Sequence, residues 1–386
     1  MFLAPARLAW LDALRGPAAL AVTMHHAGWT FIPGIWEEID RRIDFGTWGV
    51  FVFFLVSGYI IPASLERRGD LRAFWTGRVF RLLPLLLAAY CFALVLVYTG
   101  ALPLDEQFGR RSPAVIALGN LTMLQELLNL PALISVTWTL SYEMAFYLIS
   151  VALFATRQAR RSAWIAVALA VTAVPLGLLV PQTMISSQTD VHAALLGVAV
   201  VAAIATTALA SGGTRRLAAV AGGLLGLGLV VLSSRSGTWQ GLIALATMFA
   251  GTAVYRAQRK EIPWQAAAAA IATVLGCGVF ARDDLGWVMA IVLAFGVFGA
   301  AFALRERRFP RWLPWLGVIS FSLYLLHPLL LHVIPNLALY FLVLIPLSYL
   351  TYRLIEAPAQ RFGKRLLGQA RPREQGPGAD ETRTRP

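Results

Sequence analysis

Residues 8–31 read LAWLDALRGPAALAVTMHHAGWTF, an apolar stretch that is interrupted by Asp12, Arg15 and His26. The stretch is long enough to cross a bilayer as a helix, for which about 20 apolar residues are needed. A charge at the centre of such a helix costs roughly 2.5–3.5 kcal/mol on insertion scales, so ionisable residues at that depth indicate a function. These residues therefore predict a membrane helix that contributes to a polar site.

Apolar segments of similar length recur along the chain. Hydrophobic residues make up 58% of the 386 residues, 14% are charged, and the mean hydropathy is +0.67, which excludes a soluble domain. We expect an all-α polytopic integral membrane helical bundle with about 10–12 transmembrane helices. The expected helices lie near 8–31, 46–66, 79–99, 138–156, 163–181, 190–210, 216–233, 236–255, 263–281, 285–304, 312–334 and 336–356.

Arginine and lysine residues concentrate in alternate loops between these segments, for example at 157–161, 215–216 and 256–260. Short loops rich in basic residues stay in the cytoplasm, which predicts a multi-pass protein of the plasma membrane with both termini cytoplasmic. The same argument assigns the net charge of +13 to orientation and to contact with membrane lipids, and not to nucleic acid.

The apolar segments define one membrane domain over residues 1–365, whereas residues 366–386 are rich in Gly, Pro and charge and predict a disordered cytoplasmic tail. We interpret 101–137 as an external loop with an interfacial helix near 113–130. Cys91 and Cys277 lie in apolar segments and lack the spacing of metal ligands. Neither a disulfide framework nor a metal site is therefore expected.

The polar side chains of the first segment share one helix face. Arg15 and His26 are eleven residues apart, which at 100° per residue places them on the same face, about 16 Å apart along the axis. His25 points about 100° away. Asp12 precedes Arg15 by one turn and can pair with it. The alternative is a purely structural Asp12–Arg15 pair beside a histidine that only satisfies its hydrogen bonds.

Two later segments carry further polar residues at membrane depth. VTWTLSYEMAFYL contains Glu143 near the start of its helix, and ISFSLYLLHPLLLH places Ser320, Tyr324 and His327 on one face. The expected topology puts Glu143, His26 and His327 at similar depth, where they could meet. Two histidines and a glutamate at one level indicate a proton-handling site.

The start of the third segment, GRVFRLLPLLL, carries Arg78 and Arg81 at positions i and i+3. Planar guanidinium groups bind phosphate bidentately, as a nucleotide-bearing donor such as acyl-CoA requires. Anchoring to anionic lipid headgroups is an equally good interpretation of either arginine alone.

Two other features have mainly structural interpretations. Glu356 and Arg353, near the end of the last segment, are expected to form an ion pair. Ser57 and Gly58 interrupt an otherwise bulky helix, which favours close packing of a neighbouring helix over approach of a substrate to the backbone.

Six motifs occur in a fixed order along the chain. They are LDALRGPAALAVTMHH (11–26), GVFVFFLVSGYII (49–61), RVFRLLP (78–84), TWTLSYEMAFYL (137–148), GVISFSLYLLHP (317–328) and RLIEAP (353–358). This series resembles that of the membrane acyltransferase type 3 family, whose polytopic O-acyltransferases modify surface polysaccharides, peptidoglycan, lipopolysaccharide or the sugars of natural products. The resemblance implies that residues 1–365 form a transmembrane acyltransferase domain.

The resemblance also implies a reaction. An acyl group, expected to be acetyl, would move from acyl-CoA (acetyl-CoA), a co-substrate and not a permanently bound cofactor, to a hydroxyl of a carbohydrate-containing acceptor. This acceptor would be a cell-surface polysaccharide, a lipid-linked sugar or a glycosylated natural product.

Functional residues of the family fall on matching positions here. Its arginine and histidine separated by ten residues fall on Arg15 and His26, and its Trp-Ser-Leu-x-x-Glu motif falls on residues 138–143. The chain departs from the family where Phe51 replaces the usual acidic residue after Gly-Val and Met144 replaces a second glutamate. These departures weaken the transfer of a detailed mechanism.

Each candidate residue thus receives an expected role. We expect His26, tuned by Glu143, to act as general base on the acceptor hydroxyl, and Arg15 to orient the donor or stabilise charge on the thioester oxygen. The donor phosphates are expected at Arg78 and Arg81. Residues expected to support the substrate or the site are Asp12, Ser57, Trp138, Tyr324 and His327.

Two other functions stay open from the residues themselves. Intramembrane Arg, His and Glu also occur in proton-coupled pathways, so a proton-coupled transporter or flippase for a lipid-linked sugar is one alternative, although no repeated pair of broken helices supports it. The other is a structural subunit of an envelope-polysaccharide assembly, in which the polar residues only join helices.

Overall fold

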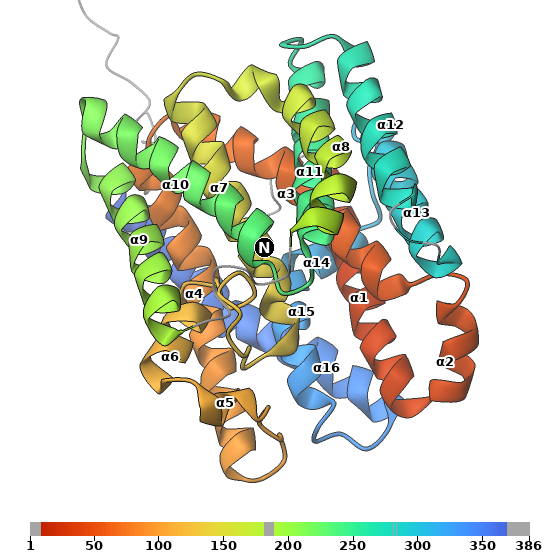
Figure 1. Ribbon diagram of the computed structural model, residues 1–386. Coiled ribbons are helices and arrows are strands. Elements are labelled where there is room, and N and C mark those ends of the chain that lie inside the picture. Colours follow the sequence, from red (N-terminus) through yellow and green to blue (C-terminus); the bar gives the residue numbers. More distant parts are fainter. Residues whose placement is uncertain (1–8, 181–188, 281, 283, 369–386) are drawn as a thin grey trace, which may run out of the picture.

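A computed structural model describes residues 9–180, 189–280, 282 and 284–368, and every regular element in these ranges is helical (Figure 1). The helices pack side by side in one bundle. The all-α architecture expected from the sequence is therefore confirmed. Most of the expected tail, from residue 369 onward, lies outside the described residues.

Short connections join most of the helices in the first half of the chain. The elements are α1 (Ala9–Phe31), α2 (Pro33–Asp40), α3 (Phe45–Arg68), α4 (Leu71–Tyr98), α5 (Gln107–Arg110), α6 (Pro113–Leu121), the 3₁₀ turn η2 (Ser135–Thr137), α7 (Trp138–Ala155), the 3₁₀ turn η3 (Ala159–Arg161) and α8 (Ser162–Leu179).

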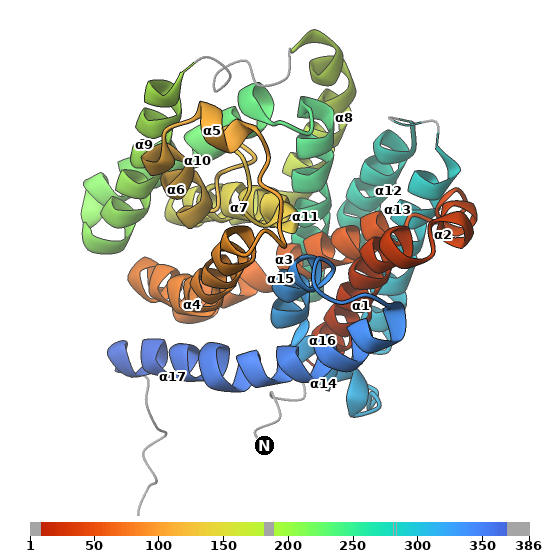
Figure 2. The same ribbon diagram turned by 90° about the horizontal axis from the view of Figure 1, so that it is seen from below.

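The second half continues the bundle and ends along one side of it, where α17 lies next to α4 in Figure 2, and α16 packs against α15. The elements are α9 (Asp190–Leu209), α10 (Gly212–Ser233), α11 (Thr238–Gln258), α12 (Trp264–Phe280), α13 (Leu285–Ala303), α14 (Trp312–Val318), α15 (Ser320–Leu330), α16 (Leu337–Thr351), the π-helical turn η4 (Tyr352–Glu356) and α17 (Ala357–Leu366).

Helices occupy all twelve expected positions, and within the described ranges eight of them are long and apolar enough to cross a membrane. The pair α14 and α15, bent by 66°, would make a ninth span if the two helices cross together. The more polar helices α1 and α11 do not meet the same criterion, and α12 has 17 residues. Length and composition therefore support a polytopic integral membrane protein.

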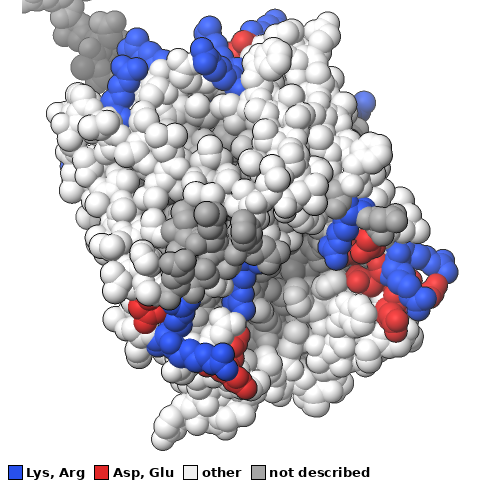
Figure 3. Space-filling view, in the orientation of Figure 1, with Lys and Arg blue, Asp and Glu red and all other residues white. Residues whose placement is uncertain are grey.

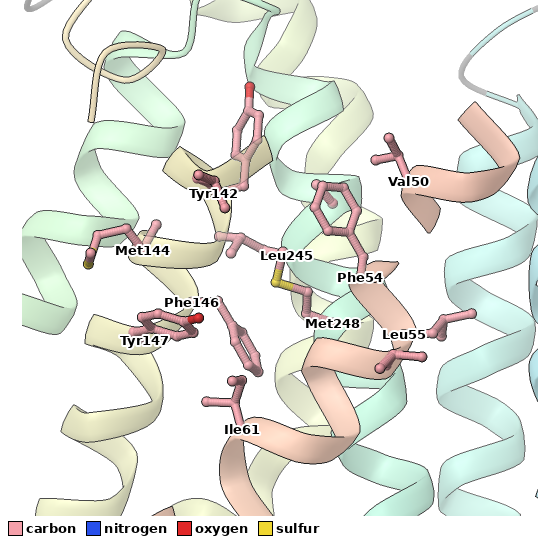
Figure 4. Close-up of a cluster of buried hydrophobic side chains, with 14 of the residues drawn as sticks. Val50, Phe54, Leu55, Ile61, Tyr142, Met144, Phe146, Tyr147, Leu245 and Met248 are labelled. Carbon is pink, nitrogen blue, oxygen red and sulfur yellow. The ribbon is translucent and has the colours of Figure 1, made fainter. Parts of the chain in front are cut away.

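The interior is built around α11, which packs against α3, α7 and α8 and is buried along most of its length. Figure 4 shows side chains of α3, α7 and α11 pointing toward one another, among them Phe54, Phe146 and Met248. A Cβ atom at Gly58 would overlap the backbone carbonyl of Met248, so the two helices are in backbone contact there. Because lipid is as apolar as the interior, this close packing is what holds such helices together.

The beginning of α4 differs from the expectation. Asp70 caps the helix by accepting hydrogen bonds from the backbone N–H groups of Arg72 and Ala73, so α4 starts at Leu71 and not near residue 79. Capping of this kind satisfies N–H groups that have no partner within the helix. Arg78 and Arg81 consequently lie inside the helix and not in a loop.

The segment 101–137 was expected to be a loop with a helix near 113–130, and its helix is shorter than that. Its helix α6 ends at Leu121, and the chain then folds back into the bundle, where Leu124, Leu127 and Leu128 are fully buried. The Asn120 side chain holds this return by donating to the carbonyl of Pro131 and accepting from the backbone N–H of Leu133. Sequence periodicity did not indicate the return because it depends on one amide side chain.

The expected ion pair between Arg353 and Glu356 is not formed. Residues 352–356 form a π-helical turn, and widening of this kind rotates residues relative to an α-helix. Arg353 is exposed and donates to the Tyr349 hydroxyl, whereas Glu356 is buried and accepts a hydrogen bond from Ser322. The carboxylate therefore belongs to the interior of the bundle.

Charged side chains gather at two levels of the face shown in Figure 3, with a broad uncharged band between them. At the lower level they lie over α2 and over the α5 region, and the surface is hollowed between these two groups. An uncharged band bounded by charge is typical of a protein that spans a membrane.

Candidate active site

Two cavities open inside the bundle. The arginine cavity encloses about 750 Å³ including its open mouth, and its polar lining consists of Arg15, Ser57, Arg78, Arg81, Thr139, Glu143, Ser320 and Tyr324. The histidine cavity encloses about 570 Å³ on the same basis and is lined by His25, His26, Asp44, Thr47, Val50, Trp138, Gln240, Trp287 and Tyr324, among others. Val50 and Tyr324 line both cavities and therefore lie between them.

Positive charge dominates the arginine cavity. Arg15 is 3.8 Å from Asp12, as the helical spacing predicted. Arg78 is buried and stacks its guanidinium over the rings of Phe74 and Tyr147, at 5.2 and 5.3 Å. In the described part of the chain, no carboxylate lies within ion-pair distance of Arg78 or Arg81, so this cavity can bind an anion.

Glu143 lies in the arginine cavity and not beside His26. Its carboxylate accepts hydrogen bonds from Tyr147, at 2.6 Å, and from Ser57, at 3.2 Å. The expected contact between Glu143 and His26 is absent from the described residues, because the two side chains line different cavities. The negative charge of Glu143 instead interacts electrostatically with Arg15 and Arg78.

His26 lines the histidine cavity, and its ring contacts that of His327. Nδ1 of His26 lies 2.9 Å from the Val22 carbonyl and 3.3 Å from Nε2 of His327, whose own Nδ1 is 3.3 Å from the Leu323 carbonyl. Because a carbonyl only accepts, Nδ1 of each neutral ring carries the hydrogen. Nε2 of His26 then keeps its lone pair, as a general base requires.

The Tyr324 side chain is fixed in the wall between the cavities. Its hydroxyl donates to the Val136 carbonyl at 3.0 Å and lies 2.9 Å from Oγ1 of Thr139. Ser320, on the same helix, donates a hydrogen bond to the Gly317 carbonyl at the bend between α14 and α15. Of the face that the sequence predicted, Ser320 thus lines the arginine cavity and Tyr324 lines both cavities, whereas His327 is buried against His26.

Two functional candidates were missed by sequence reasoning. His25 lies 3.2 Å from Asp40 and 3.6 Å from Asp44, so it has the carboxylate neighbours that His26 was expected to have. Burial, followed by the nearby carboxylates of Asp44 and Asp284, raises the pKa of Asp40 to about 6. Glu356 is the other residue, and its carboxylate interacts electrostatically with the arginines of the neighbouring cavity. Neither residue lies in a periodic pattern that could have indicated it.

Two polar cavities inside a bundle of apolar helices define a polytopic membrane protein with an intramembrane site. The model of the acyltransferase 3 family, described as an acyltransferase domain, matches residues 8–355. The chain belongs to this family.

A curated relative agrees with this assignment. The chain is 31% identical over 152 residues to acyltransferase MdmB of Streptomyces mycarofaciens. This match spans 37% of the chain and 38% of the relative, so it covers well under half of that protein. No solved structure matches the chain significantly.

Proposed function

We propose that the protein is an integral membrane O-acyltransferase that moves an acyl group, most simply acetyl, from acyl-CoA to a hydroxyl of a carbohydrate-containing acceptor. The observation that carries this proposal is the pair of cavities with different chemistry that share Val50 and Tyr324. One cavity is cationic and suits a phosphorylated donor, and the other contains a histidine with a free lone pair.

The donor binds in the arginine cavity, with its phosphates at Arg78 and Arg81 and its thioester directed toward the wall. Charge-assisted hydrogen bonds to phosphate are roughly twice as strong as neutral ones. This end faces the cytoplasm, where acyl-CoA is made, and both termini lie on that side of the plasma membrane. Acyl-CoA is a co-substrate and not a permanently bound cofactor, because it supplies the acyl group in each turnover.

The acceptor binds in the histidine cavity. Trp138 and Trp287 offer aromatic faces, and the Gln240 amide and Thr47 hydroxyl can exchange hydrogen bonds with sugar hydroxyls. A lipid-linked sugar or another carbohydrate conjugate fits this mixture of flat apolar and hydrogen-bonding surface. The reacting hydroxyl then lies near Nε2 of His26.

Transfer begins when Nε2 of His26 takes the proton of the acceptor hydroxyl. The oxygen attacks the thioester carbonyl, the carbon–sulfur bond breaks, and the CoA thiolate leaves and receives the proton from the imidazolium. Arg15 stabilises the negative charge that develops on the carbonyl oxygen. His327 accepts the hydrogen of Nδ1 and keeps the His26 ring oriented, which is a positioning role.

The test is turnover of acetyl-CoA by the full-length protein in nanodiscs, with a panel of alkyl glycosides as acceptors and release of free CoA as the readout. We expect the wild type to acylate a glycoside and His26→Ala to lose about 10²–10⁴-fold in rate. His332→Ala is the matched control, because His332 is exposed. A near-wild-type rate in His26→Ala would remove His26 as the base. Movement of a glycolipid across the bilayer without acylation would favour the flippase alternative.

A further inference from the structure

Three side chains converge where α1, α2 and α3 meet beside the histidine cavity. His25 comes from the last turns of α1, Asp40 from the last residue of α2, and Asp44 from the residue that caps α3. One possible ligand atom from each of them lies within 4.8 Å of the other two. Nδ1 of His25 lies 3.2 Å from an oxygen of Asp40 and 3.6 Å from an oxygen of Asp44.

The two distances from Nδ1 of His25 are close to the edges of a tetrahedral zinc site. Bonds of about 2.0–2.2 Å from zinc to nitrogen and oxygen give ligand-to-ligand distances of roughly 3.3–3.6 Å in a tetrahedron. A hydrogen-bonded histidine–aspartate pair would have one oxygen aligned with the N–H group. Nδ1 of His25 and Oδ1 of Asp40 are both buried and lie 3.2 Å from each other, yet neither atom makes a hydrogen bond among the described residues. Buried polar atoms without partners are rare and point to an ion or ligand that would satisfy them.

The three side chains are held in place by their surroundings. Asp44 accepts hydrogen bonds from the backbone N–H and the hydroxyl of Thr47, and its own N–H donates to the Gly286 carbonyl at 3.1 Å. A Cβ atom at Gly46 would lie 2.9 Å from the His25 ring, so the glycine leaves room for the ring at this position. The donor set is therefore built into the helix junction.

Negative charge at this junction is not balanced by the nearest arginines. Arg41 and Arg42 directly follow Asp40 but pair with Glu37 and Glu38 on the exposed side of α2. In the parts of the chain that the structure describes, neither Asp40 nor Asp44 forms an ion pair with an arginine or lysine, and both face the imidazole of His25. A divalent cation would compensate both carboxylates at once, and imidazole with carboxylate donors suits zinc.

We propose that His25, Asp40 and Asp44 bind one Zn²⁺ ion, whose fourth position faces the histidine cavity. This inference rests on the proposed function only for the role of the ion, which is to bind and polarise the acceptor hydroxyl next to His26. It replaces the expectation from sequence that the chain has no metal site. The spacing of cysteines could not indicate this site, because its ligands are a histidine and two aspartates from three elements.

The test is zinc binding by the full-length protein after treatment with a chelator and addition of Zn²⁺, measured as metal content per chain and by titration calorimetry. We expect one tightly bound ion in the wild type and at least tenfold weaker zinc binding in Asp40→Asn. Mutation of a group that only hydrogen-bonds to a metal ligand already weakens metal binding by about 10–100-fold, so loss of a ligand should weaken it at least as much. Glu38→Gln is the matched control, since it removes an exposed carboxylate of the same helix. Co²⁺ in place of zinc should give the visible absorption of a tetrahedral site.

Equal zinc binding in the wild type and Asp40→Asn, or no tight binding in the wild type, would overturn the site. Should Asp40→Asn fail to fold, His25→Gln and the Co²⁺ spectrum of the wild type decide the question. Release of CoA is measured in the same preparations. If the protein binds zinc but transfers no acyl group, the proposed function is contradicted and the metal site stands. If the protein transfers the acyl group but binds no zinc, the metal site is contradicted and the proposed function stands.

Discussion

The two cavities meet at Tyr324 and yet are built for different tasks. Over the residues that the structure describes, Arg78 and Arg81 of the arginine cavity form no ion pair, whereas the histidine cavity is lined by His26, whose Nδ1 hydrogen points to the Val22 carbonyl and whose ring contacts His327. A single helix, α1, supplies Arg15 to one cavity and His26 to the other. The difference separates binding of charge from handling of a proton, and variants on the two sides should therefore fail in different ways.

The largest effect is expected on the histidine side. His26→Gln keeps a hydrogen-bonding group of similar size but removes the base, so kcat should fall by about 10²–10⁴-fold. Binding of CoA, measured by calorimetry, should stay unchanged because the donor lies in the other cavity. A large loss of CoA binding in His26→Gln would show that the two sides are not separate.

The next largest effect is expected on the arginine side. Arg81→Ala should raise KM for acetyl-CoA by about 10–100-fold, since hydrogen bonds to charged groups contribute roughly 1.5–3 kcal/mol. Arg72→Ala, on an exposed position of the same helix, is the matched control. Acetyl-pantetheine lacks the nucleotide phosphates, so KM for this donor should be equal in Arg81→Ala and the wild type. If Arg81→Ala impairs both donors equally, the arginine does not bind phosphate.

Removal of the Tyr324 ring between the two cavities should have a smaller effect, and this effect should be on the coupling of CoA release to the acceptor. Tyr324→Ala removes the ring between the cavities and should admit water to the thioester, because exclusion of water protects such intermediates. We expect release of CoA in the absence of acceptor to rise several-fold. Tyr324→Phe keeps the ring and should keep transfer coupled to the acceptor, despite the loss of the hydrogen bonds to Val136 and Thr139. Equal coupling in Tyr324→Ala and the wild type would mean that another residue closes the wall.

The sequence predicted the helices and the composition of each helix face, but not how the faces meet. Spacing along α1 correctly placed Asp12 beside Arg15, because both residues lie on one helix with a known period. The rotation of α7 against α1 depends on packing across several helices, so the partner of Glu143 could not be read from spacing. Asp40 and Asp44 flank a short connection that has no helical period, and Glu356 lies in a π-helical turn that the residue pattern did not predict.

Glu143 gives the smallest expected effect and the sharpest distinction between the cavities. The isosteric change Glu143→Gln keeps an acceptor for the Tyr147 and Ser57 hydroxyls but removes one negative charge from the arginine cavity. KM for acetyl-CoA should therefore fall slightly, by less than about threefold, as expected for loss of a like charge near a partly hydrated phosphate site. The dependence of kcat on pH should not move, because Glu143 does not contact His26. A shifted pH profile with unchanged KM would instead return Glu143 to the role of tuning the base.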